Sequence, residues 1–289
     1  MLSGIVASVI LFAVVEQNES LDSRLLPLID AHHGKVAVAV KNLETGEQLR
    51  HRADEPMPTA SLIKLAVMIE VYQQAAEGKI SLDDMFTLTE ADKVPGSGVL
   101  TSHFSPGATI SQRDAVRLMI AYSDNTATNL VLDKIGLPAT AARMEAWGFP
   151  HTKIHSKVFR RETSVFSDRS RQFGLGSTTA GEMIGLLEEV HSGKRFGEKD
   201  RAAMIGHLKQ CQDRDKFSRF LPPGTVVAHK TGSVDRTRTD AGILFTPRGP
   251  VALCVLTTDN EDTTWRTDNA GNLLCANIAR VVFDYFNKP

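Results

Sequence analysis

The sequence predicts an α+β protein, in which one antiparallel sheet is built from both ends of the chain and flanked by terminal helices, with an all-α domain inserted. Three observations support this fold class. Strand patterns occur near both ends, at 36–52 and 225–257. The segment between them, about 59–220, has helical spacing of its apolar residues. Amphipathic helix patterns precede the first strand and follow the last one.

The first residues differ from the rest of the chain. Residues 5–15 are almost wholly apolar and residues 16–20 are abruptly polar, a length too short for a comfortable membrane span. A secretory signal fits better, although no lysine or arginine precedes the apolar run and no clean Ala-x-Ala site follows it. We therefore expect residues 1–19 to be a signal peptide and the protein to be exported, periplasmic or secreted. An apolar N-terminal helix or a non-cleaved anchor is the alternative.

The N-terminal part of the unit that follows, about 20–58, predicts a helix and a hairpin. A leucine stripe from 21 to 29 indicates the helix, which Gly34 ends. Residues 36–40 form a continuous apolar run typical of a buried strand, and 48–52 return as its hairpin partner after the Glu-Thr-Gly-Glu turn at 44–47.

The all-α part is divided by caps and stop signals. Ser111 with Asp114 resembles a capping box and opens a helix that carries apolar residues to Ile120. Gly136 and Gly148 are stop signals. The further helices are expected at 126–135, 139–147, 179–193 and 199–211. The last part, about 221–289, returns to strands at 225–229, 241–245 and 251–257 and closes with a helix at 272–286.

Composition is that of an ordinary globular protein, with 42% hydrophobic and 23% charged residues and a net charge of -1. Basic residues are spread along the chain and the net charge is small, so we expect neither a nucleic-acid partner nor a stable membrane partner. We also expect a monomer. Cys211, Cys254 and Cys275 lack metal-ligand spacing and are expected to be buried, with a bridge between the last two compatible with export. His151 and His155 flank no acidic third ligand, so neither a metal nor a cofactor is expected.

The stretch with most chemistry is Ser61-Leu62-Ile63-Lys64, which opens an apolar helical run over 62–71. Pro58 and Thr59 are start signals, with the threonine able to cap free N–H groups. Residues three apart share a helix face, so the amine of Lys64 can reach the hydroxyl of Ser61, and the helix dipole favours a negative oxygen there. This is the arrangement of an activated nucleophile.

Two later strings complete a known signature. Ser123-Asp124-Asn125 follows an amphipathic helix, and Lys230-Thr231-Gly232-Ser233 lies in a strand pattern. A Ser-x-x-Lys helix, a Ser-x-Asn element and a Lys-Thr-Gly strand, in this order, mark the active-site serine penicillin-recognising enzymes. The chain resembles a class A β-lactamase from about Leu21 to the C-terminal helix. The D-Ala-D-Ala peptidases share all three elements.

The resemblance implies a catalytic set in a cleft between the two parts of the fold. Ser61 is the nucleophile, Lys64 its base or proton relay, and Ser123 a shuttle to the leaving nitrogen. The backbone N–H groups of Ser61 and Ser233 form the oxyanion hole, in which one donor typically contributes about 3 kcal/mol.

The resemblance also implies the substrate contacts. Asn125 holds the substrate side-chain amide. Lys230, Thr231 and Ser233 engage the substrate carboxylate, because a positive charge and hydroxyl donors suit an anion. An edge strand with a lysine reaching to solvent is the structural alternative. His229 precedes Lys230, faces the other side of the strand and is expected to be structural.

A glutamate in a long loop activates the deacylating water in class A enzymes, and Glu162 stands at the matching place. The alternative is a solvated charge beside two arginines. The loop departs from the family pattern: Phe166 replaces an asparagine, and no aspartate stands at 175–176, although Asp168 could pair with Arg160. We therefore expect deacylation that is slow or differently organised.

Two loops are expected near the cleft. The segment 234–238 replaces a glycine-rich turn, and its Arg236 and Arg238 either add a carboxylate contact or, as we favour, are exposed turn residues. The glycine-rich loop 96–98 borders the cleft. The sequence thus predicts a serine β-lactamase acting on small β-lactams. A D-Ala-D-Ala peptidase or esterase, or a β-lactam-sensing domain, are the alternatives.

Overall fold

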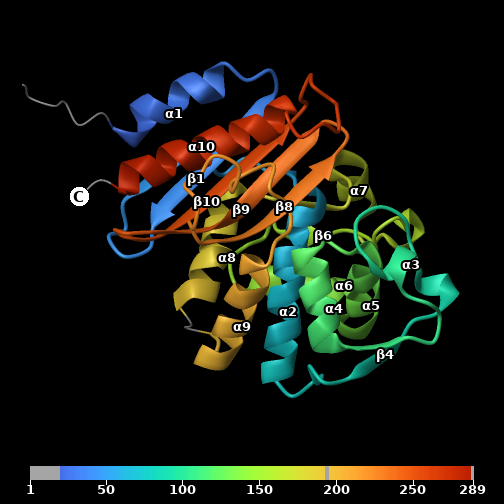
Figure 1. The fold of residues 1–289 in the computed structure, drawn as a ribbon. Helices are drawn as coiled ribbons and strands as arrows, with labels where there is room; N and C mark the ends of the chain where they lie inside the picture. The colour runs from blue at the N-terminus through green and yellow to red at the C-terminus, as the bar shows by residue number, and fades with distance from the viewer. Residues whose placement is uncertain (1–19, 193–194, 288–289) are drawn as a thin grey trace, which may run out of the picture.

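A five-stranded antiparallel sheet organises the computed structural model, which describes residues 20–192 and 195–287 (Figure 1). Its strand order is β2-β1-β10-β9-β8. The strands are β1 (Lys35–Asn42), β2 (Gln48–His51), β8 (Val227–Val234), β9 (Thr237–Thr246) and β10 (Gly249–Thr258). Because β1 pairs with β10 in the register Lys35↔Thr258 to Asn42↔Val251, the sheet is built from both ends of the chain, as predicted. The predicted signal peptide lies outside the described residues.

Two helices cover one face of this sheet. Helices α1 (Leu21–Asp30) and α10 (Ala270–Phe286) lie side by side across it (Figure 1). The valines at 36, 38 and 40 alternate toward this face and join the apolar core beneath the two helices. The hydroxyl of Ser20 accepts from the N–H of Ser23 at the start of α1, and the side chain of Asn269 accepts from the N–H groups of Gly271 and Asn272 at the start of α10. Backbone N–H groups in the first turn of each helix therefore have a side-chain partner.

The opposite face packs against the helical part. Ala37 and Ala39, which alternate with the valines, belong to the larger core that this part shares with the sheet. Helix α8 (Ala180–Ser192) packs on β1 and β10, and α9 (Glu198–Lys209) on β8. These two helices therefore belong to the sheet layer as much as to the predicted all-α domain of 59–220.

Helix α2 (Lys64–Ala76) is buried over most of its surface. The other helical elements of this part are α3 (Leu100–His103), α4 (Gln112–Ala121), α5 (Asn125–Ile135), α6 (Leu137–Ala146) and α7 (Ser167–Phe173), with 3₁₀ turns η1 (Ala60–Ile63), η2 (Glu90–Asp92) and η3 (Arg161–Thr163). Of these, α4, α5 and α6 pack against α2. The predicted cap at Ser111 is confirmed, since its hydroxyl accepts from the N–H of Asp114. Thr59 does not cap: its hydroxyl donates to the carbonyl of Ala60, and Ser61 lies in a 3₁₀ turn before α2 begins.

Five short strands were not predicted. They form a three-stranded sheet, β3 (Met57–Pro58), β7 (Gly176–Thr178) and β6 (Lys153–Ile154), and a two-stranded one, β4 (Met85–Thr87) and β5 (Thr109–Ser111). Two or three residues are too few to show a period of two. The first of these sheets ties the segment just before Ser61 to the loop region that follows α6.

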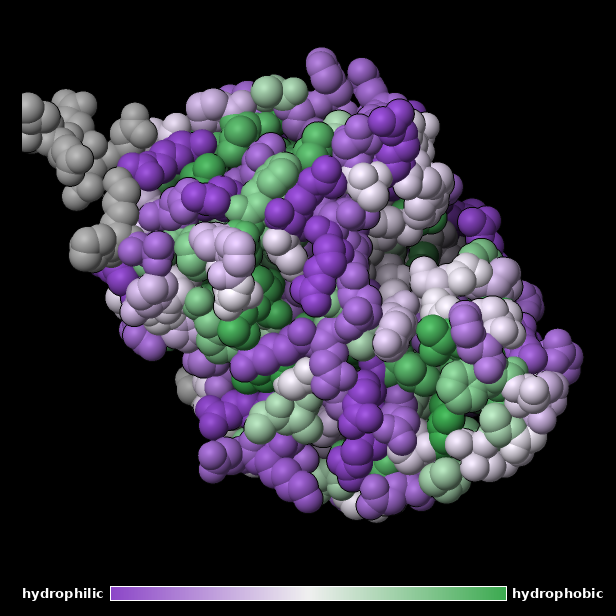
Figure 2. Space-filling model, in the orientation of Figure 1, coloured by the Kyte–Doolittle hydropathy of each residue, from purple (hydrophilic) through white to green (hydrophobic). Residues whose placement is uncertain are grey.

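The molecular surface and the cysteines fit an ordinary globular chain. On the face shown in Figure 2, charged and polar residues (purple) lie between smaller groups of apolar ones (green). The three cysteines are free thiols and buried, so the bridge considered between Cys254 and Cys275 is not formed. Within the described ranges, no helix combines the length and apolar character needed to span a membrane.

Candidate active site

A cleft of about 980 Å³ lies between the sheet part and the helical part. Its wall includes Ser61, Ser123, Asn125, Lys230, Thr231 and Ser233, so six of the eight predicted site residues meet there. Lys64 is fully buried beneath them. The predicted loop also borders the cleft, through Gly96 and Ser97.

The turn that carries Ser61 is docked directly on strand β8. Ala60 has a positive φ of 46°, uncommon for a residue with a side chain. A Cβ on Gly232 would lie 2.3 Å from the carbonyl oxygen of Thr59, so only glycine permits this approach. Thr239 donates from its hydroxyl to the same oxygen over 2.8 Å. The Lys-Thr-Gly strand and the nucleophile turn are therefore fixed to each other by backbone contact.

The amine of Lys64 contacts three polar atoms of the site. It contacts the backbone oxygen of Ser123 at 2.7 Å, the Ser123 hydroxyl at 3.3 Å and Asn125 Oδ1 at 2.8 Å. Burial, helped by the charge of Lys230 and opposed by Asp124, holds the pKa of Lys64 well below its usual value. A neutral amine has two N–H donors and one lone pair. The two donors suit the backbone oxygen of Ser123 and Oδ1 of Asn125, and the lone pair can accept from the Ser123 hydroxyl. These hydrogen bonds run to Ser123 and Asn125 rather than to Ser61.

Ser123 is held at the exit of α4 in a left-handed conformation, with φ of 54°. The next residue, Asp124, caps α5 by accepting from the N–H of Ala127 at 2.8 Å. It also accepts from the N–H of Leu100 at 2.9 Å. This buried carboxylate therefore joins the Ser-x-Asn element to the loop that borders the cleft.

The side-chain amide of Asn125 is hydrogen-bonded at both ends within the protein. Its oxygen accepts from Lys64, and its nitrogen donates to the carbonyl of Pro95 at 2.9 Å. A Cβ on Gly96 would lie 2.8 Å from that nitrogen. Asn125 thus fixes the loop on one side and the lysine on the other, in addition to its predicted substrate contact.

Lys230 faces the site from β8. Its amine donates to the Ser123 hydroxyl at 3.1 Å and to the carbonyl of Thr231 at 2.6 Å. Burial lowers its pKa. Strand β8 is an edge strand, but the alternative in which its lysine reaches solvent is wrong, because Lys230 is fully buried.

His229 lies on the other side of β8, as predicted. Its Nδ1 is 3.0 Å from both carboxylate oxygens of Asp240, and both residues are buried. Burial disfavours its charge, but Asp240 and Cys211 outweigh burial and raise the pKa of His229 to about 10. In turn, burial raises the pKa of the Cys211 thiol, but the hydrogen bond and charge of His229 and the charge of Lys230 outweigh burial, so the pKa is lowered overall. Cys211 lines the cleft, and no sequence motif connects it to His229.

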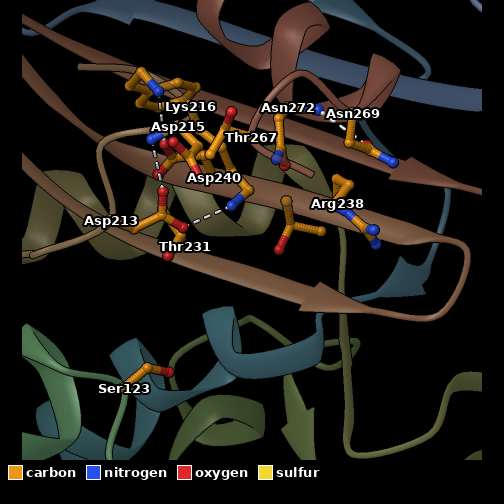
Figure 3. A network of polar contacts seen from close by, with 12 residues as sticks. Ser123, Asp213, Asp215, Lys216, Thr231, Arg238, Asp240, Thr267, Asn269 and Asn272 are labelled. Atoms are coloured by element: carbon orange, nitrogen blue, oxygen red, sulfur yellow. Dashed lines mark hydrogen bonds and ion pairs between the residues drawn. The ribbon is translucent and has the colours of Figure 1, made fainter. Parts of the chain in front are cut away.

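Sequence reasoning also missed an ion pair near β8, the strand that carries Lys230 and Thr231. Asp213 lines the cleft and accepts from Lys216 at 2.6 Å and from the N–H of Asp215 at 2.9 Å. Figure 3 shows these contacts beside Thr231. Burial raises the pKa of Asp213, but the charge of Lys216 and its hydrogen bonds outweigh this and lower it to about 2. Asp213 is therefore an anion beside residues expected to hold an anion.

Glu162 is not among the residues that line the cleft. Glu162 is exposed in η3, and its neighbour Arg161 lines the cleft instead. Asp213 and Asp235 are the carboxylates that line the cleft among the described residues. Phe166, which stands in place of the family asparagine, packs edge-on against His155 with ring centroids 6.2 Å apart.

The suggested pair of Asp168 and Arg160 is wrong. Asp168 pairs with Arg171 one turn along α7, and Arg160 donates to the carbonyl of Ala91. A hydrogen bond from the Arg160 side chain to a backbone carbonyl therefore ties the loop to the segment at 90–92, in place of the suggested ion pair.

The two arginines after the Lys-Thr-Gly strand behave differently. Arg236 is exposed, as favoured, and donates to the carbonyls of Asn260 and Asp259. Arg238 is buried, so the exposed-turn interpretation is wrong for it. Its guanidinium donates to the backbone carbonyls of Asp235, Thr237 and Thr264, which gives the buried cation hydrogen-bond partners.

Comparison with known proteins decides the family. A family profile described as "Beta-lactamase enzyme family" matches residues 20–286. The chain belongs to this family. A β-lactamase of Streptomyces cellulosae is 31% identical over 83% of this chain and 78% of its own length. β-Lactamase OXY-2 of Klebsiella oxytoca is 26% identical, over 85% and 83% respectively.

Solved structures of other proteins share the fold. The crystal structure of a β-lactamase from Sphaerobacter thermophilus superposes with a TM-score of 0.81 at 28% identity, covering 93% of this chain and 99% of that one. A structure of PBP-A gives 0.80 at 22% identity, with 93% and 96% covered, and shows the fold alone. Membership of the β-lactamase family is therefore established. We infer the roles of individual residues from the contacts in the cleft of this chain.

Proposed function

We propose that this protein is a serine β-lactamase that opens the β-lactam amide through an acyl-enzyme on Ser61. The observation that carries the proposal is the Ser123 hydroxyl, contacted by both Lys64 and Lys230 in the cleft that Ser61 lines. A nucleophile, a lysine with a lowered pKa and a hydroxyl between two amines are the groups that amide cleavage requires. The family supports this reaction class.

In the acylation step, the Ser61 oxygen attacks the lactam carbonyl carbon while neutral Lys64 takes the hydroxyl proton. The backbone N–H groups of Ser61 and Ser233 stabilise the oxyanion. The C–N bond then breaks, and the proton passes from Lys64 through the Ser123 hydroxyl to the ring nitrogen. The product is an ester of Ser61 and a neutral amine, so one proton has moved from oxygen to nitrogen.

Substrate contacts follow from the same wall. Asn125 holds the amide of the substrate side chain, and Lys230, Thr231 and Ser233 hold its carboxylate. The nearby Asp213 anion opposes carboxylate binding, so the positive charge of Lys230 is needed at this position.

The ester must then be hydrolysed, and this step separates a β-lactamase from a penicillin-binding peptidase. Glu162 stays our candidate for the base that activates water. Its exposed position supports the expectation of slow deacylation, because a base must lie within hydrogen-bond reach of the water it activates. The same observation favours a second candidate function, a D-Ala-D-Ala peptidase or esterase that remains acylated by penicillins.

Intact-mass spectrometry with a penicillin, run beside a chromogenic cephalosporin assay, tests the proposal. We expect a one-to-one adduct and turnover, both lost in Ser61→Ala and both kept in Ser105→Ala, which changes an exposed serine. An adduct that persists without turnover supports the peptidase instead. Absence of both adduct and turnover rejects each of the two functions.

Glu162→Gln tests the deacylation base. We expect the adduct to form at the wild-type rate and to decay more slowly, with Asp168→Asn, an exposed carboxylate of the neighbouring helix α7, as the control. Full turnover in Glu162→Gln would refute the role of Glu162.

We also propose that residues 1–19 direct export and that the mature protein is a monomer. The apolar run at 5–15 supports export. Cell fractionation, N-terminal sequencing and light scattering of the purified protein test these points. An uncleaved cytoplasmic protein or a stable dimer would contradict them.

A further inference from the structure

An exposed tryptophan stands at the mouth of the cleft. Trp265 lies in the loop between β10 and α10, lines the cleft and keeps 71% of its surface exposed. Large apolar side chains are seldom left so exposed at a cleft unless something binds against them.

The side chain of Arg238 packs over the indole ring of Trp265. The guanidinium carbon of Arg238 lies 5.0 Å from the Trp265 ring centroid, a cation–π distance. Its nitrogens donate to the carbonyls of Asp235 at 2.9 Å and Thr237 at 2.8 Å on one side, and of Thr264 at 2.6 Å on the other. A buried arginine thus ties the turn after the Lys-Thr-Gly strand to the loop that carries the tryptophan.

The rest of the loop is fixed as well. Asn269 donates from its side-chain nitrogen to the carbonyl of Thr264 at 3.0 Å, and Asp262 accepts from the N–H of Thr264 at 2.9 Å. Figure 3 shows Arg238, on β9, and Asn269, at the start of α10. Trp265 therefore loses little conformational freedom on binding, which favours contact with a ligand.

Aromatic rings also rim the helical wall of the cleft. Tyr122 and Phe159 both line it, 46% and 63% exposed. Phe159 has a positive φ of 57°, and its ring packs where a Cβ on Gly96 would lie, at 3.1 Å. The cleft thus offers flat apolar surfaces on both of its walls, above the polar floor at Ser123 and Lys230.

We propose that Trp265 is a specificity-determining residue, whose free face stacks on a planar aryl group carried by the acylating substrate, with Arg238 as its positioning residue. The identity of the substrate class rests on the proposed function. One face of the indole is covered by the guanidinium and the remainder is exposed, so an aromatic ring can pack in offset or edge contact. Such a contact changes apparent affinity by about tenfold.

The kinetic test compares two penicillins with the same nucleus: benzylpenicillin, which carries an aryl group, and 6-aminopenicillanic acid, which does not. Trp265→Ala is expected to raise the KM for benzylpenicillin about tenfold with kcat little changed, and to leave 6-aminopenicillanic acid unaffected. Trp265→Phe, which keeps a ring, should restore most of the loss. Equal losses on both penicillins, or no loss on either, overturn the proposal.

Arg238→Lys keeps the charge but not the planar fork. It should give the same aryl-selective rise in KM. A loss of kcat on both penicillins instead would show a general structural role for Arg238.

Fluorescence separates this proposal from the proposed function. The chain has two tryptophans, so Trp147→Phe in a Ser61→Ala background leaves Trp265 as the reporter. Benzylpenicillin should quench or shift its emission and 6-aminopenicillanic acid should not, whether or not the wild type turns either over. Identical responses to both, or a silent tryptophan, reject the aryl contact. Loss of turnover in the wild type rejects only the proposed function.

Discussion

Lys230 donates a hydrogen bond to the hydroxyl of Ser123 over 3.1 Å, and so places a second amine beside the group that Lys64 contacts. The positive charge of Lys230 is one of the causes that lower the pKa of Lys64, after burial. The two lysines therefore titrate in each other's field, and a change to one alters the chemistry of the other.

The pH dependence of acylation should report this coupling. A base acts when neutral, so acylation rises as pH increases through the lowered pKa of Lys64. Lys230→Gln removes one of the charges that lower the pKa of Lys64. The acid limb of the pH–rate profile for acylation should therefore move to higher pH. Quench-flow with intact-mass detection measures the acylation rate constant. At saturating penicillin, weaker substrate binding in a variant does not change this value. Lys230→Arg keeps the charge and should keep the limb in place; a shift to lower pH in the Gln variant would contradict the coupling.

Cys211 should be the most reactive of the three cysteines. Its pKa is lowered by His229 and Lys230 despite burial, whereas burial raises the pKa values of Cys254 and Cys275. Because the thiolate is the nucleophile, iodoacetamide at neutral pH should label Cys211 first, as peptide mapping would show. Prior acylation with penicillin should slow the labelling, since Cys211 lines the cleft. Equal labelling of all three thiols would contradict the assignment.

The ion pair of Arg143 and Glu70 should contribute to stability. Arg143 Nε lies 2.9 Å from a carboxylate oxygen of Glu70, which is buried in α2, so Arg143→Met leaves a buried charge without this partner. We expect the free energy of unfolding to fall by about 3 kcal/mol, measured by urea denaturation. The exposed pair partner Arg171→Met should change it by less than about 0.5 kcal/mol.

A double variant sharpens this experiment. Adding Glu70→Gln to Arg143→Met removes the uncompensated charge, and most of the lost stability should return. If the double variant is no more stable than Arg143→Met alone, the loss came from packing and not from the buried carboxylate.

The long elements of the fold could be predicted because each repeats its signal. Helix α10 shows an apolar stripe over four turns, and β1 contains a continuous apolar run at 36–40. The cleft residues of the three motifs could also be predicted, because Ser61, Ser123 and Lys230 carry chemistry in a recognisable order.

The rest depends on contacts that no local pattern encodes. Arg238 looks like an exposed turn residue in sequence, and it is buried because the loop at 262–269 folds over it. Cys211 and His229 meet because α9 packs on β8, which is a tertiary event. The position of Glu162 is likewise set by the path of a loop, for which periodicity gives no information.

The pairing of β1 with β10 also fixes the order in which the molecule can form. As the chain leaves the ribosome, the helices around α2 and the β1–β2 hairpin are complete long before β10 is made, yet the central sheet cannot close without it. Contacts between such distant segments form slowly, because a long loop must be closed first. The nascent chain therefore carries its nucleophile, Ser61, well before it carries Lys230, and catalytic competence arrives with the last strands to be synthesised.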